Sequence, residues 1–383
     1  MNTPIASSEA WIILNAIPHI GPVNTRRLLN AFSDDPLAIL QASAKDLMSV
    51  KGIGEKAAQS IKGWRSAFDL DRELRKLKDT SSEFIDWTSE RYPERLRTIY
   101  DPPVGLYQAG EYRFNETQPV ISIVGSRRTT LYGLRIARQF AQRLVSVGFC
   151  IVSGLARGID SAAHEGALEA GGHTVAVLGN GLDIIYPPEN LELYRKVIDK
   201  GAILSEFCFG RRADRQTFPM RNRIISGLSD GVLVIESDEN GGSMITARFA
   251  AEQGRQVYAI PGRIDQATSR GCHQLIKEGA ILTTGIEDIL EDLRYRMANP
   301  EFSFSSEESS GESEDQKPPP RLNLDLDADE HRIIRVLESE KELGLDEIVE
   351  LSGLPVSVVG AKLMMLELKK VIRKQLDGTF TLT

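Results

Sequence analysis

Residues 211–228 form the segment of this 383-residue chain with the most side chains able to bind an anion. It contains one aromatic residue, Phe218, and five arginines: Arg211, Arg212, Arg215, Arg221 and Arg223. A guanidinium offers phosphate oxygens a planar fork of N–H donors, and an aromatic ring can stack on an unpaired base. Together with Asn222, the segment therefore favours binding of single-stranded nucleic acid. The alternative is structural, with Phe218 in the core and arginines paired with buried carboxylates.

Two shorter segments have a similar composition, and each directly follows an apolar run. Gly125-Ser126-Arg127 combines a backbone that a ligand can approach closely with a hydroxyl and a guanidinium. Ser153, Gly154 and Arg157 repeat this combination after the next apolar run. Neither segment has the glycine spacing of a dinucleotide-binding loop or a P-loop, so those ligands are not indicated. The two segments favour an anion-binding edge, and the alternative is an ordinary turn with a surface arginine.

Catalytic and metal sites have little support in the sequence. Asp160 and His164 are four residues apart on a helical pattern, but no nucleophile with its own base accompanies them, so we interpret both as structural. The cysteines at 150, 208 and 272 are widely spaced and form no C-x-x-C pair, which argues against a thiolate metal site or a disulfide framework. We therefore expect no catalytic residue, no metal and no cofactor.

The elements that position these segments alternate between short apolar runs and helical patterns over residues 118–298. The runs are 120–124, 149–152, 174–178, 202–205, 231–235, 256–260 and 280–283. Runs that are apolar throughout are buried on both faces, so they predict a mostly parallel, doubly wound α/β sheet, a Rossmann-like domain. Ligands of such sheets bind outside the carboxyl ends of the strands, which is where the arginine segments fall.

A helical module is expected ahead of this domain, over residues 1–80. Two similar turns, at 17–22 and 50–56, each precede an apolar-periodic helix, as in helix-hairpin-helix or SAM-like units. The second turn, with Gly52 and Gly54, has backbone N–H groups that could hold a phosphate, although many such turns are purely structural. We interpret residues 81–117 as a connector.

The end of the chain is expected to form a separate small domain. Residues 299–327 are acidic and rich in Ser and Pro, which predicts a disordered linker. Residues 328–383 read as helix, helix, turn, helix and a hairpin across Asp377-Gly378, the outline of a winged helix. Whether this domain reads DNA or docks a protein stays open, because its third helix carries few basic residues before Lys369.

The charge and hydropathy of the chain exclude a membrane span and do not exclude a nucleic-acid ligand. The formal net charge is −8, but the acidic excess is concentrated between 301 and 330. The early apolar stretch, Trp11 to Ile17, is too short to cross a bilayer and has no basic residue before it. We therefore expect a cytoplasmic protein.

The order of the motifs resembles the DNA-processing protein A family, DprA or Smf. The matching segments are Gly125-Ser126-Arg127, Ser153 to His164, Phe218 to Ser229, Gly242 to Ala247 and Pro261-Gly262. The resemblance implies a non-catalytic protein that binds incoming single-stranded DNA in natural transformation, protects it and loads the RecA recombinase. The chain departs from the family at Gly241, where members commonly have serine.

The residues that we expect to contact DNA come from all three arginine segments. They are Gly125, Ser126, Arg127, Ser153, Gly154, Arg157, Arg215, Phe218, Arg221, Asn222 and Arg223. A homodimer is also expected, because His273, Ile276 and Leu282 could form an apolar patch at the edge of the sheet and family members self-associate. The alternative is that these side chains pack under the domain's own linker.

Two other functions remain as alternatives. Residues 240–246 are similar to the phosphate-binding loop of Rossmann-like nucleoside-monophosphate phosphoribohydrolases, but the catalytic glutamate expected there is not placed. The other alternative is a structural hub whose linker and winged helix bind partner proteins. A hub differs from the single-stranded DNA-binding protein described above only in whether the central domain binds nucleic acid.

Overall fold

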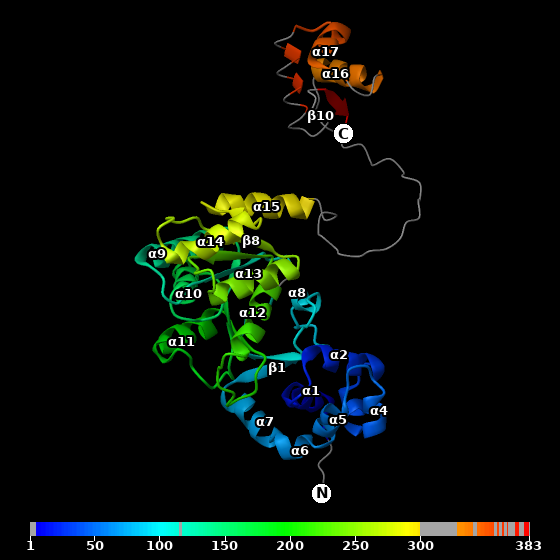
Figure 1. The fold of residues 1–383 in the computed structure, drawn as a ribbon, viewed down its shortest axis with the longest axis vertical. Helices are drawn as coiled ribbons and strands as arrows, with labels where there is room; N and C mark the ends of the chain where they lie inside the picture. Colours follow the sequence, from blue (N-terminus) through cyan, green and yellow to red (C-terminus); the bar gives the residue numbers. More distant parts are fainter. Residues whose placement is uncertain are drawn as a thin grey trace. The chain divides into compact units, whose positions relative to one another are not determined.

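The computed structural model describes residues 5–114, 117–298, 328–339 and 343–355, with shorter stretches at 358–359, 362–363, 366, 372–374 and 379–382. The chain divides into two compact units, residues 1–306 and residues 307–383. In the first unit, a helical region, blue in Figure 1, precedes a sheet with helices on both faces. The predicted linker over 299–327 lies outside the described residues.

A nine-stranded sheet forms the centre of the first unit, in the order β1-β2-β6-β5-β4-β3-β7-β8-β9. The strands are β1 (Ser82–Asp86), β2 (Gly105–Ala109), β3 (Val120–Gly125), β4 (Cys150–Ser153), β5 (Thr174–Leu178), β6 (Ala202–Ser205), β7 (Gly231–Ile235), β8 (Gln256–Ala259) and β9 (Ile281–Leu282). From β3 to β9 every strand is parallel to its neighbours in this group. The predicted Rossmann-like sheet is therefore confirmed.

Residues 81–117 do not form the connector that the sequence suggested. They contribute β1, β2 and the short helix α8 (Glu94–Arg97), and both strands pair antiparallel, β1 with β2 and β2 with β6. The apolar pattern does not reveal β1, because Ile85 is its one buried residue. An edge strand that is mostly half-exposed lacks the continuous apolar run that marks a central strand.

Helices cover both faces of the sheet, because alternate residues of the central strands enter different cores. They are α9 (Leu131–Ser146), α10 (Ile159–Glu169), α11 (Leu191–Lys200), α12 (Thr217–Gly227), α13 (Gly242–Glu252), α14 (Ala267–Lys277) and α15 (Ile286–Ala298). In β3, Ile121 and Ile123 pack with α9, α10 and α15, whereas Val120 and Val124 pack with α12, α13 and α14. Burial on both faces explains the apolar runs.

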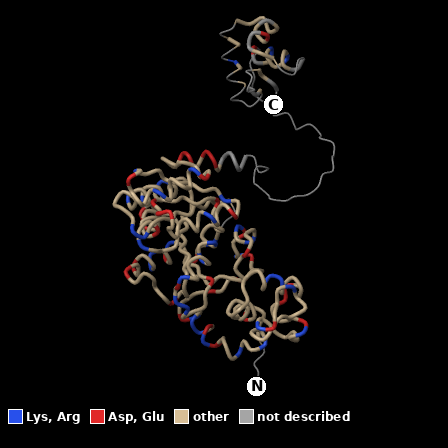
Figure 2. Tube along the Cα trace, in the orientation of Figure 1, with Lys and Arg blue, Asp and Glu red and all other residues tan. Residues whose placement is uncertain are grey.

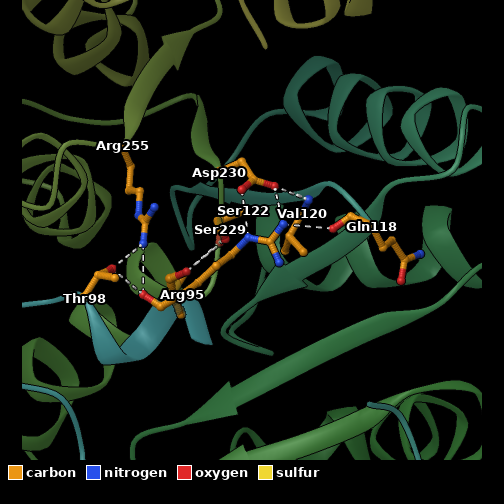
Figure 3. A network of polar contacts seen from close by, with 9 residues as sticks. Arg95, Thr98, Gln118, Val120, Ser122, Ser229, Asp230 and Arg255 are labelled. Atoms are coloured by element: carbon orange, nitrogen blue, oxygen red, sulfur yellow. Dashed lines mark hydrogen bonds and ion pairs between the residues drawn. The ribbon is translucent and has the colours of Figure 1, made fainter. Parts of the chain in front are cut away.

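At the amino end of the sheet, arginines are held by acceptors from the protein itself (Figure 3). Arg95 Nε donates to Asp230 Oδ1 at 2.8 Å, and Asp230 Oδ2 accepts from the backbone N–H of Val120, also at 2.8 Å. Arg255 Nη2 donates to the carbonyl of Arg95 at 2.9 Å and to Thr98 Oγ1 at 3.1 Å. These bonds fix α8 to the first residues of β3 and β7.

The helical region packs against the sheet within the same unit. Its helices are α1 (Ser7–Ala16), α2 (Pro22–Ala31), α3 (Pro36–Gln41), α4 (Ala44–Met48), α5 (Glu55–Lys62), α6 (Trp64–Ala67) and α7 (Leu70–Asp79). They surround a core that includes Trp11, Leu28 and Ile61. Asn15 Nδ2 donates to the carbonyl of Glu206 at 2.9 Å, so the region is attached to the loop after β6.

The second unit has the elements of a winged helix. They are α16 (Ala328–Ser339), α17 (Leu345–Ser352), β10 (Ile372–Lys374) and β11 (Phe380–Leu382), with the two strands antiparallel. Val359, Leu363 and Leu366, which the sequence places on one helix face, are all buried in its core. The predicted turn at Asp377-Gly378 lies outside the described residues. Among the residues that are described, no helix of either unit is long and apolar enough to span a membrane.

Candidate nucleic-acid interface

A cavity of about 540 Å³ opens at the carboxyl ends of β3, β4 and β7. From β3 the chain builds the sheet outward through β4, β5 and β6, and then returns to the other side of β3 with β7. A crevice at such a reversal of strand order is where open α/β sheets bind their ligands. We refer to this cavity as the switch-point cavity. Its walls are the loop after β3, the start of α12 and the start of α13.

Seven of the predicted DNA-binding residues line the switch-point cavity. They are Gly125, Ser126, Arg127, Arg215, Phe218, Arg221 and Asn222. Arg128, Ser237, Asp238 and Gly241 to Ser243 also line it and are not among the predicted residues. Arg128 could have been found from its position beside Arg127, and the residues after β7 from the shared edge at which the carboxyl ends of parallel strands meet.

The open side of the cavity carries cations and an aromatic platform. The guanidinium of Arg127 lies over the ring of Phe218, 4.5 Å from its centroid. Arg127, Arg128 and Arg215 are exposed, and among the described residues none of them has a carboxylate within ion-pair distance. Phe218 is half-buried, so it is neither enclosed in the core nor fully exposed. Cations and an aromatic ring are thus available to a ligand.

Arg221 forms the floor of the cavity. It is 4% exposed, and its Nη1 donates to the carbonyl of Val177 at 2.8 Å. Burial lowers the pKa of Arg221 to about 10, although Asp160 opposes the shift, so the side chain stays protonated at neutral pH. Burial in turn raises the pKa of Asp160, and Arg221 is the main opposing influence. A Cβ atom at Gly154 would overlap the Arg221 guanidinium, so this glycine leaves room for the arginine.

Four predicted residues lie outside the cavity: Ser153, Gly154, Arg157 and Arg223. Ser153 is fully buried and its Oγ donates to the carbonyl of Ile123 at 2.6 Å. Arg223 is 2% exposed and pairs with Glu206 at 2.5 Å and with Asp101 at 3.1 Å. The expectation that Arg223 belongs to the open arginine surface is therefore corrected. Residues 221 and 223 of one helix point in different directions, because a helix turns by about 100° per residue.

Arg157 is exposed but already has a partner. It forms an ion pair with Glu189, 32 residues further along the chain, on the loop before α11. Neither residue lines the switch-point cavity. The pair stands at the end of the β4–α10 loop, beside the residues that do.

Glu236 holds the loop that carries Arg127 and Arg128. Its Oε2 accepts hydrogen bonds from Thr129 Oγ1 at 2.5 Å and from the Thr130 N–H at 2.7 Å, and its Oε1 accepts from Thr130 Oγ1 at 2.6 Å. Thr130 also caps α9 by accepting from the N–H of Gly133. Both oxygens of Glu236 are engaged in this way, so this buried carboxylate positions the loop.

The predicted dimer patch is only partly open. β9 forms one edge of the sheet, and Leu282 on it is 49% exposed. Ile276 packs partly against the core, and a ring nitrogen of His273 lies 3.0 Å from the carbonyl oxygen of Gly262. Of the three residues, Leu282 is the most available to a partner.

A family model matches each of the three regions of the chain. The model described as DNA recombination-mediator protein A matches residues 83–294, the DprA winged helix domain matches 317–378, and a SAM-like helix-hairpin-helix tandem matches 12–62. The Smf protein of Escherichia coli is 39% identical over 376 residues, covering 95% of this chain and 93% of that protein. The DNA processing protein DprA of Streptococcus pneumoniae is 44% identical over 204 residues, covering 53% of this chain and 72% of that protein.

Solved structures agree with the sequence comparisons. The X-ray structure of DprA from Streptococcus pneumoniae matches with a TM-score of 0.65 and 32% identity, covering 76% of this chain and 99% of that one. The DNA processing protein A of Helicobacter pylori, a structure described for its single-stranded DNA binding mode, matches with a TM-score of 0.50 and 30% identity, covering 57% of this chain and 96% of that one. With a family model over more than half of its length, this chain belongs to the DNA recombination-mediator protein A family, DprA or Smf.

Proposed function

We propose that this protein binds single-stranded DNA in the switch-point cavity and takes part in the processing of incoming DNA during natural transformation. The observation that carries the proposal is the pair formed by Arg127 and Phe218 at the mouth of the cavity, flanked by two more exposed arginines. An unpaired base can stack on the ring while the guanidinium groups bind the phosphates on either side of it. In duplex DNA the bases are paired and stacked on one another, so the ring gives a preference for single strands.

The relatives support this choice of ligand. The Helicobacter pylori structure concerns single-stranded DNA binding by a DNA processing protein A, and the match covers 57% of this chain. The Bacillus subtilis and Streptococcus pneumoniae relatives are likewise DNA processing proteins.

Further parts of the proposal concern the fate of the bound strand. We propose that the protein acts in the cytoplasm without catalysing a reaction, that it protects the bound strand from nucleases, and that it loads RecA onto it. Nuclease digestion of a labelled strand, with and without the protein, tests protection. RecA-dependent ATP hydrolysis on a strand already covered by a single-stranded DNA-binding protein tests loading. Cleavage of the strand by the protein alone would contradict the non-catalytic role.

The central experiment compares binding of single-stranded and duplex DNA of the same sequence by the full chain, over a range of salt concentrations. We expect tighter binding of the single strand. In Arg215→Ala the salt dependence should fall by about 0.7 in the slope of log affinity against log salt, as expected for one lost phosphate contact on a single strand. Equal affinity for both forms of DNA, with no effect of Arg215→Ala, would contradict the proposal.

We also propose a homodimer through the edge strand β9. A two-fold dimer would cover Leu282 and place two switch-point cavities in one particle, which increases avidity for a long strand. Sedimentation of the wild type and of Leu282→Arg tests this, since the exposed position tolerates the charge without loss of folding. A monomeric wild type at micromolar concentration, or a dimeric variant, would remove this surface from consideration.

A further inference from the structure

A second groove begins where the switch-point cavity ends. It lies between α9 and α10, which pack side by side, and it encloses about 680 Å³. Arginines and amides line it: Arg135, Arg138, Arg157, Gln139, Gln142 and Asn190. These side chains are hydrogen-bond donors of the kind that bind phosphate and sugar oxygens. We refer to it as the α9–α10 groove.

The groove and the cavity share a wall. Ala156 lines the switch-point cavity, whereas the next two residues, Arg157 and Gly158, line the groove. A Cβ atom at Gly158 would overlap the carbonyl oxygen of Ser126, so the loops after β3 and β4 are in close contact here. A ligand that leaves the cavity over these loops therefore enters the groove directly.

Tyr186 provides an aromatic surface at this transition. Tyr186 is 39% exposed, and its ring centroid lies 6.1 Å from that of Phe218. The loop between β5 and α11, which carries Tyr186, is held against the groove by Asn190. Its Nδ2 donates to the carbonyl of Leu155 at 2.9 Å and to Ser161 Oγ at 2.8 Å. Glu189, on the same loop, raises the pKa of Arg157 by hydrogen bonding, and Tyr186 adds to the effect. Tyr186 therefore lies near Phe218, on the loop whose Glu189 pairs with Arg157.

Two arginines of the groove, Arg138 and Arg157, are paired with glutamates that solvent can reach. The side chains of Arg157 and Glu189 are 55% and 51% exposed, and Arg138 pairs with Glu165 and Glu169 in the same exposed way. Exposed ion pairs contribute little to stability, so a phosphate can replace the carboxylate at small cost. This distinguishes them from the buried pair of Arg223 and Glu206, which no ligand can reach.

We propose that the bound single strand continues from the switch-point cavity past Tyr186 and Arg157 into the α9–α10 groove, and that Glu189 competes with the strand's phosphates for Arg157. The inference rests on the proposed single-stranded DNA binding and extends it by a path. Glu189 then limits affinity for long strands, while a short strand that fills only the cavity does not sense it.

The test uses the full chain and two labelled oligothymidylates, of about 6 and about 20 nucleotides, because known single-strand site sizes are about 4–16 nucleotides and the longer strand exceeds them. Glu189→Gln should bind the long strand about 2- to 5-fold more tightly, with a salt slope steeper by about 0.7, and should bind the short strand as the wild type does. The matched control is Glu192→Gln. It removes the same charge three residues away, from an exposed pair with Arg195 at 2.7 Å that lines neither cavity nor groove.

Two further variants separate a direct contact from a general change of charge. In the double variant Glu189→Gln, Arg157→Ala, the gain in affinity for the long strand should be lost. Any gain that remains should be no larger than the one in the control Glu192→Gln. Tyr186→Leu should weaken binding of the long strand about 5-fold or more and leave the short strand unaffected, whereas Tyr186→Phe should match the wild type. Thermal unfolding of each variant checks that the fold is intact.

Several outcomes would overturn the path. They are a gain in Glu189→Gln that persists without Arg157, an equal gain in Glu192→Gln, or losses in Tyr186→Leu that are the same for both strands. If the short strand binds to the wild type while the long-strand effects are absent, the path is wrong and the cavity remains the site. If the wild type binds neither strand, the proposed function itself fails.

Discussion

Arg95 and Arg255 at the amino end of the sheet and the exposed arginines of the switch-point cavity at its carboxyl end have opposite surroundings. At the amino end, Arg95 and Arg255 are held by Asp230, Thr98 and backbone carbonyls, and they fasten α8 to the strands (Figure 3). At the carboxyl end, the exposed arginines of the switch-point cavity have no carboxylate partner among the described residues, and one stacks on Phe218. The same side chain therefore serves as a structural tie where the fold supplies acceptors and as a ligand-binding group where it does not.

Charge density alone does not distinguish the two ends. Lys and Arg are interspersed with Asp and Glu along the trace of the first unit (Figure 2). Availability is decided residue by residue, by burial and by the distance to an acceptor. Variants of the tied arginines should therefore change stability, whereas variants of the exposed ones should change DNA binding.

The largest effect is expected for Arg223→Ala. The change leaves Glu206 buried without its cation, so the free energy of unfolding should fall by about 3–5 kcal/mol. Urea denaturation followed by circular dichroism measures it. Arg215→Ala, an exposed arginine eight residues earlier, is the control and should change stability by no more than about 0.5 kcal/mol. A stable Arg223→Ala protein that no longer binds DNA would show that Arg223 belongs to the DNA-binding surface.

The two ends of the sheet are compared directly by Arg95→Ala and Arg127→Ala. Arg95→Ala should lower the free energy of unfolding by about 1.5–3 kcal/mol, because it removes hydrogen bonds to a charged, partly buried Asp230. The folded variant should bind single-stranded DNA as the wild type does. Arg127→Ala should do the opposite, with unchanged stability and a salt slope reduced by about 0.7. The distinction fails if both variants change the same property.

Phe218→Ala separates stacking from charge within the carboxyl end. Loss of the ring should weaken single-stranded DNA binding by about 1–3 kcal/mol, with the salt slope unchanged, because stacking releases no counterions. Fluorescence titration at several salt concentrations measures both quantities. A fall in melting temperature with intact binding would instead make Phe218 a packing residue.

The smallest effect concerns a neutral group beneath the cavity. His164 is fully buried, with Nδ1 2.7 Å from Thr174 Oγ1, and burial, with Arg221 nearby, lowers its pKa to about 3. The unfolded chain therefore binds a proton below about pH 6.5 that the folded protein does not, so stability falls as the pH drops from 6.5 toward 3. Between pH 7 and pH 5, His164→Asn should lose less stability than the wild type, by at most ~2 kcal/mol. An identical loss in both proteins would contradict the shifted pKa.

Local periodicity in the sequence predicts the central architecture. Apolar runs predict the strands from β3 to β9, and burial on both faces explains these runs in β3 to β8. The residues Ala137, Phe140, Ala141 and Leu144 of α9 are buried, as their helical spacing indicates. The general location of the site also followed, because the ends of parallel strands meet at one edge. These are properties of local periodicity, which a linear sequence displays.

Which residues of that site face a ligand depends on tertiary contacts. Arg221 and Arg223 are two residues apart, yet one forms the floor of the cavity and the other is sealed against Glu206 and Asp101. Arg157 is held by a glutamate 32 residues away, and β1 joins the sheet although its own pattern is half-exposed. Burial and pairing depend on contacts between segments that are distant along the chain, and such contacts leave no periodic signal in a single sequence.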